Sequence, residues 1–215
     1  GLYPYTKFYL RDIKKRFDKY WTNHFSTIGL VGMNEAIRNF TTDADNIATA
    51  FGQNFAKETL NYMRNRIQEF QEEDGDLYNL EATPAEATSY RLAKINKKQY
   101  ADIITAGENE PYYTNSTHLP VGHTSDLFKA VELQNDLQIL YTGGTVLHGY
   151  LAESLDDLAV AKALVRKVFE NFELPYFTLT PTFSICEDHK YIKGEHFSCP
   201  TCGKDTLVMT RVTGF

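Results

Sequence analysis

Three cysteines and a histidine near the C-terminal end of the sequence are the residues best suited to chemistry. Cys186 and His189 are separated by two residues, and Cys199 and Cys202 repeat that spacing after nine intervening residues. A tight turn with this spacing lets two side chains converge on one ion, and thiolate and imidazole are ligands that structural zinc prefers. The sequence therefore predicts a closed, structural zinc site in which these four side chains fill every coordination position.

Two other interpretations of this cluster stay open. The first is that the cysteines are buried free thiols beside a surface histidine, although this does not explain the repeated spacing. The second is that His196 replaces one of the ligands, although it lies outside both pairs. Three clustered cysteines are not typical of a disulfide framework, so we expect a reducing compartment and hence the cytoplasm.

Two polar segments are suited to binding phosphate. Residues 83–89 begin with Thr-Pro and continue with small residues, which predicts a helix start with Thr83 as N-cap and Pro84 in the first turn. A helix N-terminus offers unpaired N–H groups and a positive dipole end to a phosphate. Residues 115–117 add a polar turn after an expected strand. The predicted substrate-binding residues are Thr83, Ala85, Glu86, Ala87, Thr88, Asn115 and Ser116.

Ordinary capping and turn chemistry remains the alternative explanation for both polar segments. Residues 26–29, Ser-Thr-Ile-Gly, are a weaker candidate for the same pocket. Further histidines have no partner that the sequence identifies, and we expect them to be structural or to lie on the surface. They are His24, His118, His123 and His148.

Composition limits the class of protein and its partners. The 215 residues are 42% hydrophobic, which is enough for one sizeable core with a small appended module. The net charge of −6 is a poor footprint for a nucleic-acid binder. No apolar run reaches the roughly 20 residues that span a bilayer, and no secretory signal is visible. We therefore expect neither a nucleic-acid partner nor a membrane.

Helices and strands are expected to alternate, which indicates the α/β class. Helices are predicted over most of 1–25 and at 42–71, 83–96 and 154–170; strands are predicted near 26–31, at 77–82, 112–116 and 176–180, and within 137–147. Ser154 is the expected N-cap of the last helix, with Asp156 and Asp157 in its first turn. Gly29 and Gly32 indicate close approach of the backbone to another segment.

Several segments together resemble one protein family. They are Gly1-Leu2-Tyr3-Pro4-Tyr5-Thr6, Asn23-His24-Phe25-Ser26-Thr27-Ile28-Gly29, Gly32-Met33-Asn34-Glu35, Ala82-Thr83-Pro84-Ala85-Glu86-Ala87-Thr88, Tyr112-Tyr113-Thr114-Asn115-Ser116-Thr117-His118-Leu119-Pro120, and the closing Cys-rich module followed by Arg211-Val212-Thr213-Gly214-Phe215. In this combination the chain resembles the C-terminal portion of the anaerobic (class III) ribonucleoside-triphosphate reductases, which are glycyl radical enzymes.

This resemblance implies a fold and a division into domains. Residues 1–180 would form the C-terminal half of a ten-stranded α/β barrel. Residues 181–204 would form a zinc-binding module, and residues 205–215 a truncated glycyl radical loop. The boundary near Pro181 is where the last expected strand gives way to the Cys-rich segment.

The resemblance also implies the chemistry. Ribonucleoside triphosphates would be reduced to 2′-deoxyribonucleotides, with the radical held on Gly214. Glycine suits this role because an α-carbon radical is planar and glycine has no side chain to clash. An activase that uses S-adenosylmethionine and an iron–sulfur cluster would install the radical, which would pass to a cysteine thiol.

No cysteine precedes Cys186, so we expect the thiyl cysteine outside this chain and the fragment alone to be inactive. The remaining N-terminal part of the reductase and a second copy in a homodimer are the expected partners. Two alternatives stay open. One is another glycyl radical enzyme of the pyruvate formate-lyase type, a group that shares the radical loop and lacks the zinc knuckle. The other is a non-enzymatic zinc-ribbon module, in which Gly214 is an ordinary turn glycine.

Overall fold

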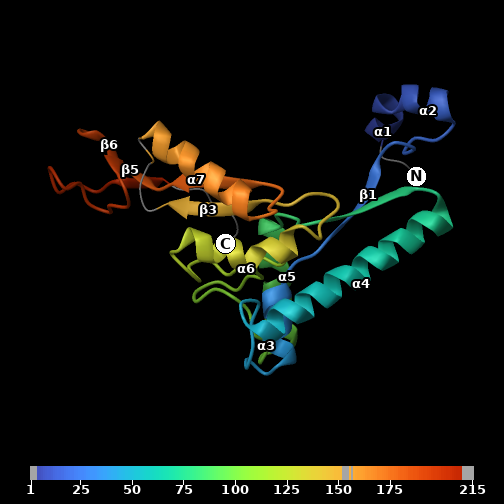
Figure 1. Ribbon diagram of the computed structural model, residues 1–215, viewed down its shortest axis with the longest axis horizontal. Coiled ribbons are helices and arrows are strands. Elements are labelled where there is room, and N and C mark those ends of the chain that lie inside the picture. Colours follow the sequence, from blue (N-terminus) through green and yellow to red (C-terminus); the bar gives the residue numbers. More distant parts are fainter. Residues whose placement is uncertain (1–3, 152–154, 156, 210–215) are drawn as a thin grey trace.

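Two pairs of parallel strands, each joined through helices, form the centre of the structure (Figure 1). The computed structural model describes residues 4–151, 155 and 157–209. The helices are α1 (Pro4–Tyr9), α2 (Arg11–Phe17), α3 (Met33–Phe40), α4 (Ala50–Asp74), α5 (Glu86–Gln99), α6 (Leu127–Gln138) and α7 (Leu158–Asn171). The strands are β1 (Phe25–Gly29), β2 (Leu77–Glu81), β3 (Leu147–Leu151), β4 (Phe177–Pro181), β5 (Phe183–Cys186), β6 (Lys190–Lys193) and β7 (Leu207–Met209).

Both parallel pairs are crossover units. β1 pairs with β2 in register from Phe25↔Leu77, and helices α3 and α4 make the connection between them. β3 pairs with β4 from Leu147↔Phe177, and α7 makes that connection. Parallel strands need a long crossover of this kind, usually helical. A bridge between Glu81 and Gly144 links the end of β2 to the segment before β3. The expected mixed α/β class is confirmed.

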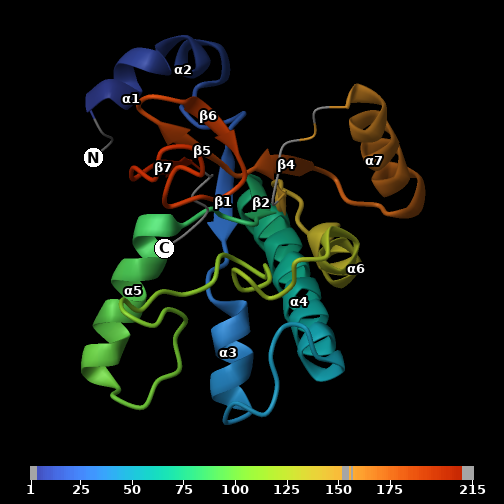
Figure 2. The same cartoon turned by 90° about the vertical axis from the view of Figure 1, so that its left-hand side faces the viewer.

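The main core lies between α4 and the strands beside it. Buried residues of α4 pack with residues from α3, β2 and α6, and the fully buried members include Ile37, Ile47, Leu60, Leu80 and Leu137. In Figure 2, α4 runs downward from the level of β2, beside α3. No helix among the described residues is both long and apolar enough to cross a bilayer.

The long helix begins later than its apolar spacing predicts. α4 starts at Ala50, with Thr49 as an N-cap whose hydroxyl accepts the N–H of Gly52. Thr42 and Asp43, predicted to be helical, have φ values of 53° and 66°, and Asp43 forms an ion pair with Arg38. This local turn excludes a helical backbone there. At its other end α4 continues three residues past the predicted 71 to Asp74, and Gly75, with a left-handed φ of 68°, terminates it.

The helix after β2 also begins later than predicted. Ala85, not Thr83, is the N-cap residue of α5, and no side chain caps it. The N–H of Ala85 instead donates to Asn115 Oδ1 at 3.2 Å. The helix start predicted at Thr83 and Pro84 from local sequence is therefore wrong, and a hydrogen bond to a distant segment holds the chain just before α5.

Two of the predicted strands are wrong. Residues 112–116 form only isolated bridges, and Ser116 has a φ of 45°, which breaks an extended backbone. The strand predicted within 137–147 is absent, because Leu137 and Gln138 are the last two residues of α6 and a turn follows them. Asp126 caps that helix by accepting the N–H groups of Phe128 and Lys129. The strand itself, β3, begins only at Leu147.

The last long helix also starts later than predicted. α7 begins at Leu158, and its N-cap is Asp157, whose carboxylate accepts the N–H of Ala159 at 2.7 Å. Ser154 and Asp156, the other residues predicted to begin this helix, lie outside the described residues.

The close approach predicted for Gly29 and Gly32 is confirmed. A Cβ built on Gly29 would lie 2.1 Å from the hydroxyl oxygen of Thr83. Gly32 has a φ of +82°, and a Cβ there would lie 3.3 Å from Tyr113. These glycines let the end of β1 and the start of α3 lie against the two polar segments.

We expect Gly32→Ala to lower the free energy of unfolding by about 1–3 kcal/mol, because it adds a side chain to a left-handed backbone and presses on Tyr113. Gly75→Ala is the matched control. Gly75 has a φ of +68° but no atom within 4 Å of the place that a Cβ would occupy, so it isolates the backbone cost. Denaturant unfolding of both variants in the full-length protein measures the difference, and equal losses would contradict a tight contact with Tyr113.

Candidate functional site

The first half of the Cys/His cluster is built by a β-hairpin. β5 lies between β6 and β7 in an antiparallel sheet. Cys186 is the last residue of β5 and pairs with Lys190, so the intervening turn returns His189 toward the Cys186 sulfur. Lys190 has a φ of 59°, which lets the chain reverse at this point.

A second tight turn supplies the other half of the cluster. The carbonyl of Cys199 accepts the N–H of Gly203 at 2.8 Å, and the N–H of Cys199 donates to the carbonyl of Lys204 at 2.7 Å. Gly203 has a φ of +71°, a conformation that glycine adopts without strain. This turn returns Cys202 toward the Cys199 side chain.

The four side chains converge on one point. The Cys186 sulfur lies 3.7 Å from that of Cys202 and 3.8 Å from His189 Nδ1, and the Cys199 sulfur lies 3.6 Å from the same nitrogen. All four ligand atoms lie within 4.8 Å of one another. Tetrahedral zinc bonds of about 2.3 Å to sulfur and about 2.0 Å to nitrogen separate neighbouring ligands by about 3.5–3.8 Å. The donor set and its geometry fit zinc.

Backbone N–H groups favour the thiolate form of two of the ligands. The N–H of His189 lowers the pKa of the Cys186 thiol. Burial acts to raise the pKa of Cys199, but hydrogen bonds from the N–H groups of Cys202 and Thr201 outweigh it and lower that pKa. Both thiols are buried. The competing ligand His196 is not in the cluster, and its Nε2 donates to the carbonyl of Lys193 at 3.0 Å.

A separate cavity of about 160 Å³ lies where three distant segments meet. Its walls come from residues near the start of α5, from the connection that leads into α6, and from β3. Glu86 and Asn115 are the predicted substrate residues that line it. Because Ala85 donates to the Asn115 side chain, the two segments predicted to bind phosphate lie side by side at its rim.

The other predicted substrate residues do not line this cavity. The Ser116 hydroxyl is buried and donates to the Tyr141 hydroxyl at 2.7 Å. Thr83 lies against Gly29, and Ala87 and Thr88 are exposed on α5. For these residues, substrate binding stays a prediction.

Two histidines that line the cavity, His118 and His148, have partners that the sequence does not identify. Both ring nitrogens of His118 lie near backbone carbonyls, at 3.1 Å from that of Asn115 and 2.7 Å from that of Val146. Burial lowers the pKa of His118, although both carbonyls favour the charged ring. His148 Nδ1 lies 2.8 Å from the Thr178 hydroxyl. These contacts give both rings a structural role, as expected, and the partners Val146 and Thr178 are too distant in sequence to be recognised from it.

The radical residue predicted from the resemblance, Gly214, lies outside the described residues, as does the rest of the segment 210–215. The structure therefore describes the approach to this segment and not the segment itself. β7 ends at Met209, directly before it, and pairs with β5 beside the Cys/His cluster.

Curated relatives match about 70% of the chain. The anaerobic ribonucleoside-triphosphate reductase of Enterobacteria phage T4 is 24% identical over 158 residues, which is 71% of this chain and 26% of that protein. The enzyme of the same name from Escherichia coli K12 is 20% identical over 156 residues, 70% of this chain and 22% of that protein. The chain thus spans about a quarter of the length of these relatives.

Solved structures share the fold. A crystal structure of the Thermotoga maritima anaerobic ribonucleotide reductase has a TM-score of 0.65 and 24% identity, covering 88% of this chain and 31% of that one. Another structure, described as an anaerobic ribonucleotide reductase, has a TM-score of 0.69 and 23% identity, covering 90% and 30%. The family profile for anaerobic ribonucleoside-triphosphate reductase matches residues 1–215. The chain belongs to the anaerobic ribonucleoside-triphosphate reductase family.

Proposed function

We propose that the protein containing this chain reduces ribonucleoside triphosphates to 2′-deoxyribonucleoside triphosphates by glycyl and thiyl radical chemistry. The observation that carries this proposal is the family match over residues 1–215. The same match favours a reductase over a pyruvate formate-lyase type of enzyme and over a non-enzymatic zinc-binding module. Because the chain spans about a quarter of its curated relatives, it supplies only part of the active site.

In this proposal the chain has three parts. Residues 1–180 belong to the second half of a ten-stranded α/β barrel, and the two parallel crossover units support this division. Residues 181–204 are a zinc-binding module, and residues 205–215 lead into the glycyl radical loop.

The zinc ion would be structural, held by Cys186, His189, Cys199 and Cys202. Four protein ligands leave no open position for water or substrate, so the ion would supply stability and no catalytic step. β7 joins this module through its pairing with β5 and continues directly into residue 210. The module would therefore fix the base of the radical loop while the tip moves between the activase and the barrel interior.

The cavity at the start of α5 would hold the substrate. The N–H groups of the first turn of α5 have no partner within the helix, so Glu86, which lines the cavity, can offer its N–H to a phosphate oxygen. Ala87 and Thr88 lie outside the cavity lining, and they would offer theirs only to phosphates that extend past the rim. Thr83, Ala85 and Ser116 would shape this rim through their backbone. A carboxylate repels phosphate, so Glu86 would accept a hydrogen bond from a hydroxyl of the substrate. The Thermotoga maritima reductase has been crystallised with dATP and CTP, which supports a nucleotide ligand.

Gly214 would carry the stored radical. An activase that uses S-adenosylmethionine and an iron–sulfur cluster would remove one hydrogen atom from its α-carbon. The radical would then take the hydrogen of a cysteine thiol in the N-terminal part of the reductase, and the resulting thiyl would abstract the ribose 3′ hydrogen. We place this enzyme in the cytoplasm, because its thiols need a reducing environment. A second copy of the reductase, in a homodimer, is a further expected partner.

The direct test is product formation. Full-length protein, incubated without oxygen with its activase and a reductant, should convert ribonucleoside triphosphates to deoxyribonucleoside triphosphates. A preparation that carries the radical and gives no deoxynucleotide would contradict the proposed function.

Asn115→Asp tests whether this cavity is the site of that reaction. Aspartate keeps the oxygen that accepts the N–H of Ala85, but it adds a negative charge at the rim. We expect the KM for ribonucleoside triphosphates to rise by about tenfold through repulsion of the phosphates. Asn46→Asp is the matched control, since Asn46 Oδ1 also accepts a backbone N–H, that of Ala48, and does not line the cavity. Equal KM values for wild type and Asn115→Asp would place the phosphates elsewhere.

A further inference from the structure

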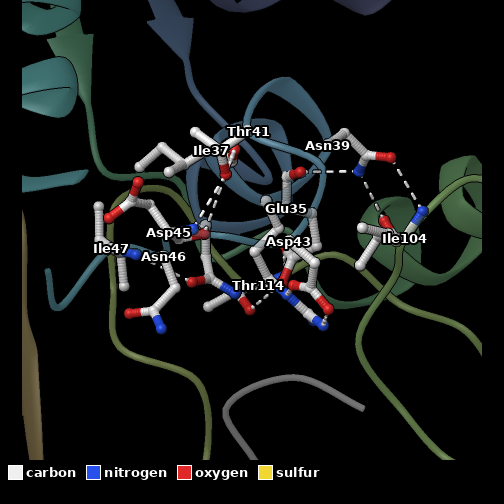
Figure 3. Close-up of polar contacts among 12 residues, drawn as sticks. Glu35, Ile37, Asn39, Thr41, Asp43, Asp45, Asn46, Ile47, Ile104 and Thr114 are labelled. Carbon is white, nitrogen blue, oxygen red and sulfur yellow. Dashed lines mark hydrogen bonds and ion pairs between the residues drawn. The ribbon is translucent and has the colours of Figure 1, made fainter. Parts of the chain in front are cut away.

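Glu35 is a buried carboxylate that hydrogen bonds hold in place. It lies in the first turn of α3 and is 1% exposed. Oε2 accepts the N–H of Thr114 at 2.8 Å, and Oε1 accepts both the Thr114 hydroxyl and the side-chain amide of Asn34, each at 2.8 Å. Figure 3 shows Glu35 and Thr114 pointing toward each other. Within the part of the chain that the structure describes, no cation lies within ion-pair distance of Glu35, and Arg38 of the same helix is paired with Asp43 instead. The carboxylate of Glu35 is therefore held by donors from Thr114 and Asn34.

The surroundings of Glu35 require an acceptor at both of its oxygens. The orientation of the Asn34 amide is fixed, because its Oδ1 accepts the N–H of Ile47 at 3.2 Å. Its NH₂ group must therefore face Glu35. The backbone N–H of Thr114 is a donor and cannot change. A glutamine at position 35 would direct its own NH₂ group at one of these two donors and leave that donor unpaired.

The Thr114 segment is bound to α3 from its other side as well. The carbonyl of Thr114 accepts the N–H of Gly32 at 2.8 Å, and the carbonyl of Ser116 accepts the N–H of Met33 at 3.1 Å. The residue between them, Asn115, holds the N–H of Ala85 at the cavity rim. Glu35 is thus connected to the turn before α5 by a hydrogen bond to Thr114, by the peptide bond to Asn115, and by the hydrogen bond from Ala85 to Asn115.

Glu35 lies behind the cavity wall and is not itself a lining residue. Tyr112 and Tyr113 line the cavity. Burial raises the pKa of both tyrosines, and the negative charge of Glu35 raises it further. The charge of Glu35 therefore acts on two residues of the cavity wall, although its oxygens accept hydrogen bonds from Thr114 and Asn34.

We propose that Glu35 is a positioning residue for the nucleotide site: it fixes Thr114, and through Asn115 it sets the turn at residues 83–86 that meets the substrate. This inference rests on the proposed function for the identity of the ligand. The arrangement of the two segments can be measured without any ligand, which separates the two claims.

The test is Glu35→Gln in the full-length reductase. Amide hydrogen exchange should become faster in residues 112–116 and 83–86, because the unpaired donor loosens the first segment and, through Asn115, the second. The KM for ribonucleoside triphosphates should rise by about tenfold, the effect of one lost buried hydrogen bond, while kcat stays within about twofold. If Glu35 had a purely structural role, Glu35→Gln would lower the stability of the protein without raising KM selectively over kcat.

Asn39→Ala is the matched control on the same helix. The Asn39 side chain forms two hydrogen bonds with the backbone of Ile104, each 2.9 Å long, and donates to the backbone carbonyl of Glu35 at 2.7 Å (Figure 3). It therefore helps to hold α3 in place without a hydrogen bond to the Glu35 carboxylate. This variant should lose stability and keep the wild-type KM. If Asn39→Ala raises KM as much as Glu35→Gln does, the effect is general loosening of α3 and the proposal is wrong.

A second pair of variants decides the matter if Glu35→Gln does not fold. Thr114→Val removes the hydroxyl that donates to Glu35 and keeps the shape of the side chain, whereas Thr114→Ser keeps the hydroxyl. Thr114→Val should raise KM and Thr114→Ser should not. Unchanged exchange at residues 83–86 in Thr114→Val or Glu35→Gln would overturn the positioning role. A wild-type protein that does not bind ribonucleoside triphosphate would overturn the proposed function. Amide hydrogen exchange at residues 83–86 would still test whether Glu35 positions that turn.

Discussion

Cys199→Ser in the full-length protein will release its zinc and unfold the C-terminal module. The buried residues that the structure describes within 181–204 are Ser184, Cys186 and Cys199, so two of the three are ligands. A module with so little apolar core would depend on a bound metal, and structural zinc binding contributes about 10–16 kcal/mol in zinc-finger peptides. The wild-type protein should hold about one zinc per chain, and the variant should hold none, as measured by elemental analysis. A Cys199→Ser protein with full zinc content would contradict the assigned site.

A pair of histidines provides the matched control for this experiment. His189→Ala should lose the ion, because its Nδ1 lies within 3.8 Å of two of the sulfurs. His196→Ala should keep it, because the ring of His196 hydrogen-bonds to Lys193 outside the cluster. Chelator treatment of the wild type should increase proteolysis within residues 181–209 and leave the cores around α4 and α7 intact. Zinc loss from His196→Ala and not from His189→Ala would show that His196 is the ligand and that His189 is not.

The Cys/His cluster was predictable from sequence because its geometry is local. Each pair of ligands is brought together by one turn, and the turn chemistry is visible in the residues themselves, such as Gly203. The approach of Gly29 and Gly32 to other segments was predictable for the same reason, since glycine at a strand end indicates that a side chain would not fit. The partners, Thr83 and Tyr113, could not be named, because they come from segments far along the chain.

The wrong predictions fall where a distant residue decides the local structure. The Thr-Pro start of α5 is replaced by a hydrogen bond between Ala85 and Asn115, 30 residues apart in sequence. The strand predicted within 137–147 is wrong because Asp126, eleven residues before Leu137, caps a helix that continues through Gln138. Short apolar runs fit a strand or a buried helix face equally well, so a cap is needed to separate them.

The cavity and Glu35 were beyond sequence reasoning for a stronger reason. Within the described residues, Glu35 receives two of its three side-chain hydrogen bonds from Thr114, 79 residues away, and a buried carboxylate cannot be distinguished from a surface one by its neighbours in the chain. The cavity combines three segments whose proximity depends on the pairing of β1 with β2 and of β3 with β4. Sequence analysis identified Glu86 and Asn115 as candidates and could not show that both line one space.

Gly214→Ala in the full-length protein will abolish deoxynucleotide formation while leaving the fold and the zinc intact. The α-carbon radical is flat and shares its electron with the flanking amide groups, so a methyl group at this position would clash within the loop. After activation, the wild type should show a doublet in electron paramagnetic resonance and the variant should show none. Thr213→Ala is the control, because Arg-Val-x-Gly leaves the residue before the glycine free, and it should retain both the signal and the activity.

Oxygen gives an independent readout of the same residue. Dioxygen adds to an α-carbon radical and breaks the backbone there, so air should cleave the activated wild-type chain at Gly214 and release a fragment that mass spectrometry can assign. The inactive protein and the activated Gly214→Ala variant should both stay whole. Because cleavage requires the radical but not the substrate, it separates a missing radical from a damaged nucleotide site such as that of Glu35→Gln. An activated Gly214→Ala protein that still produced deoxynucleotides, or a wild type cut elsewhere in the chain, would move the radical to another residue.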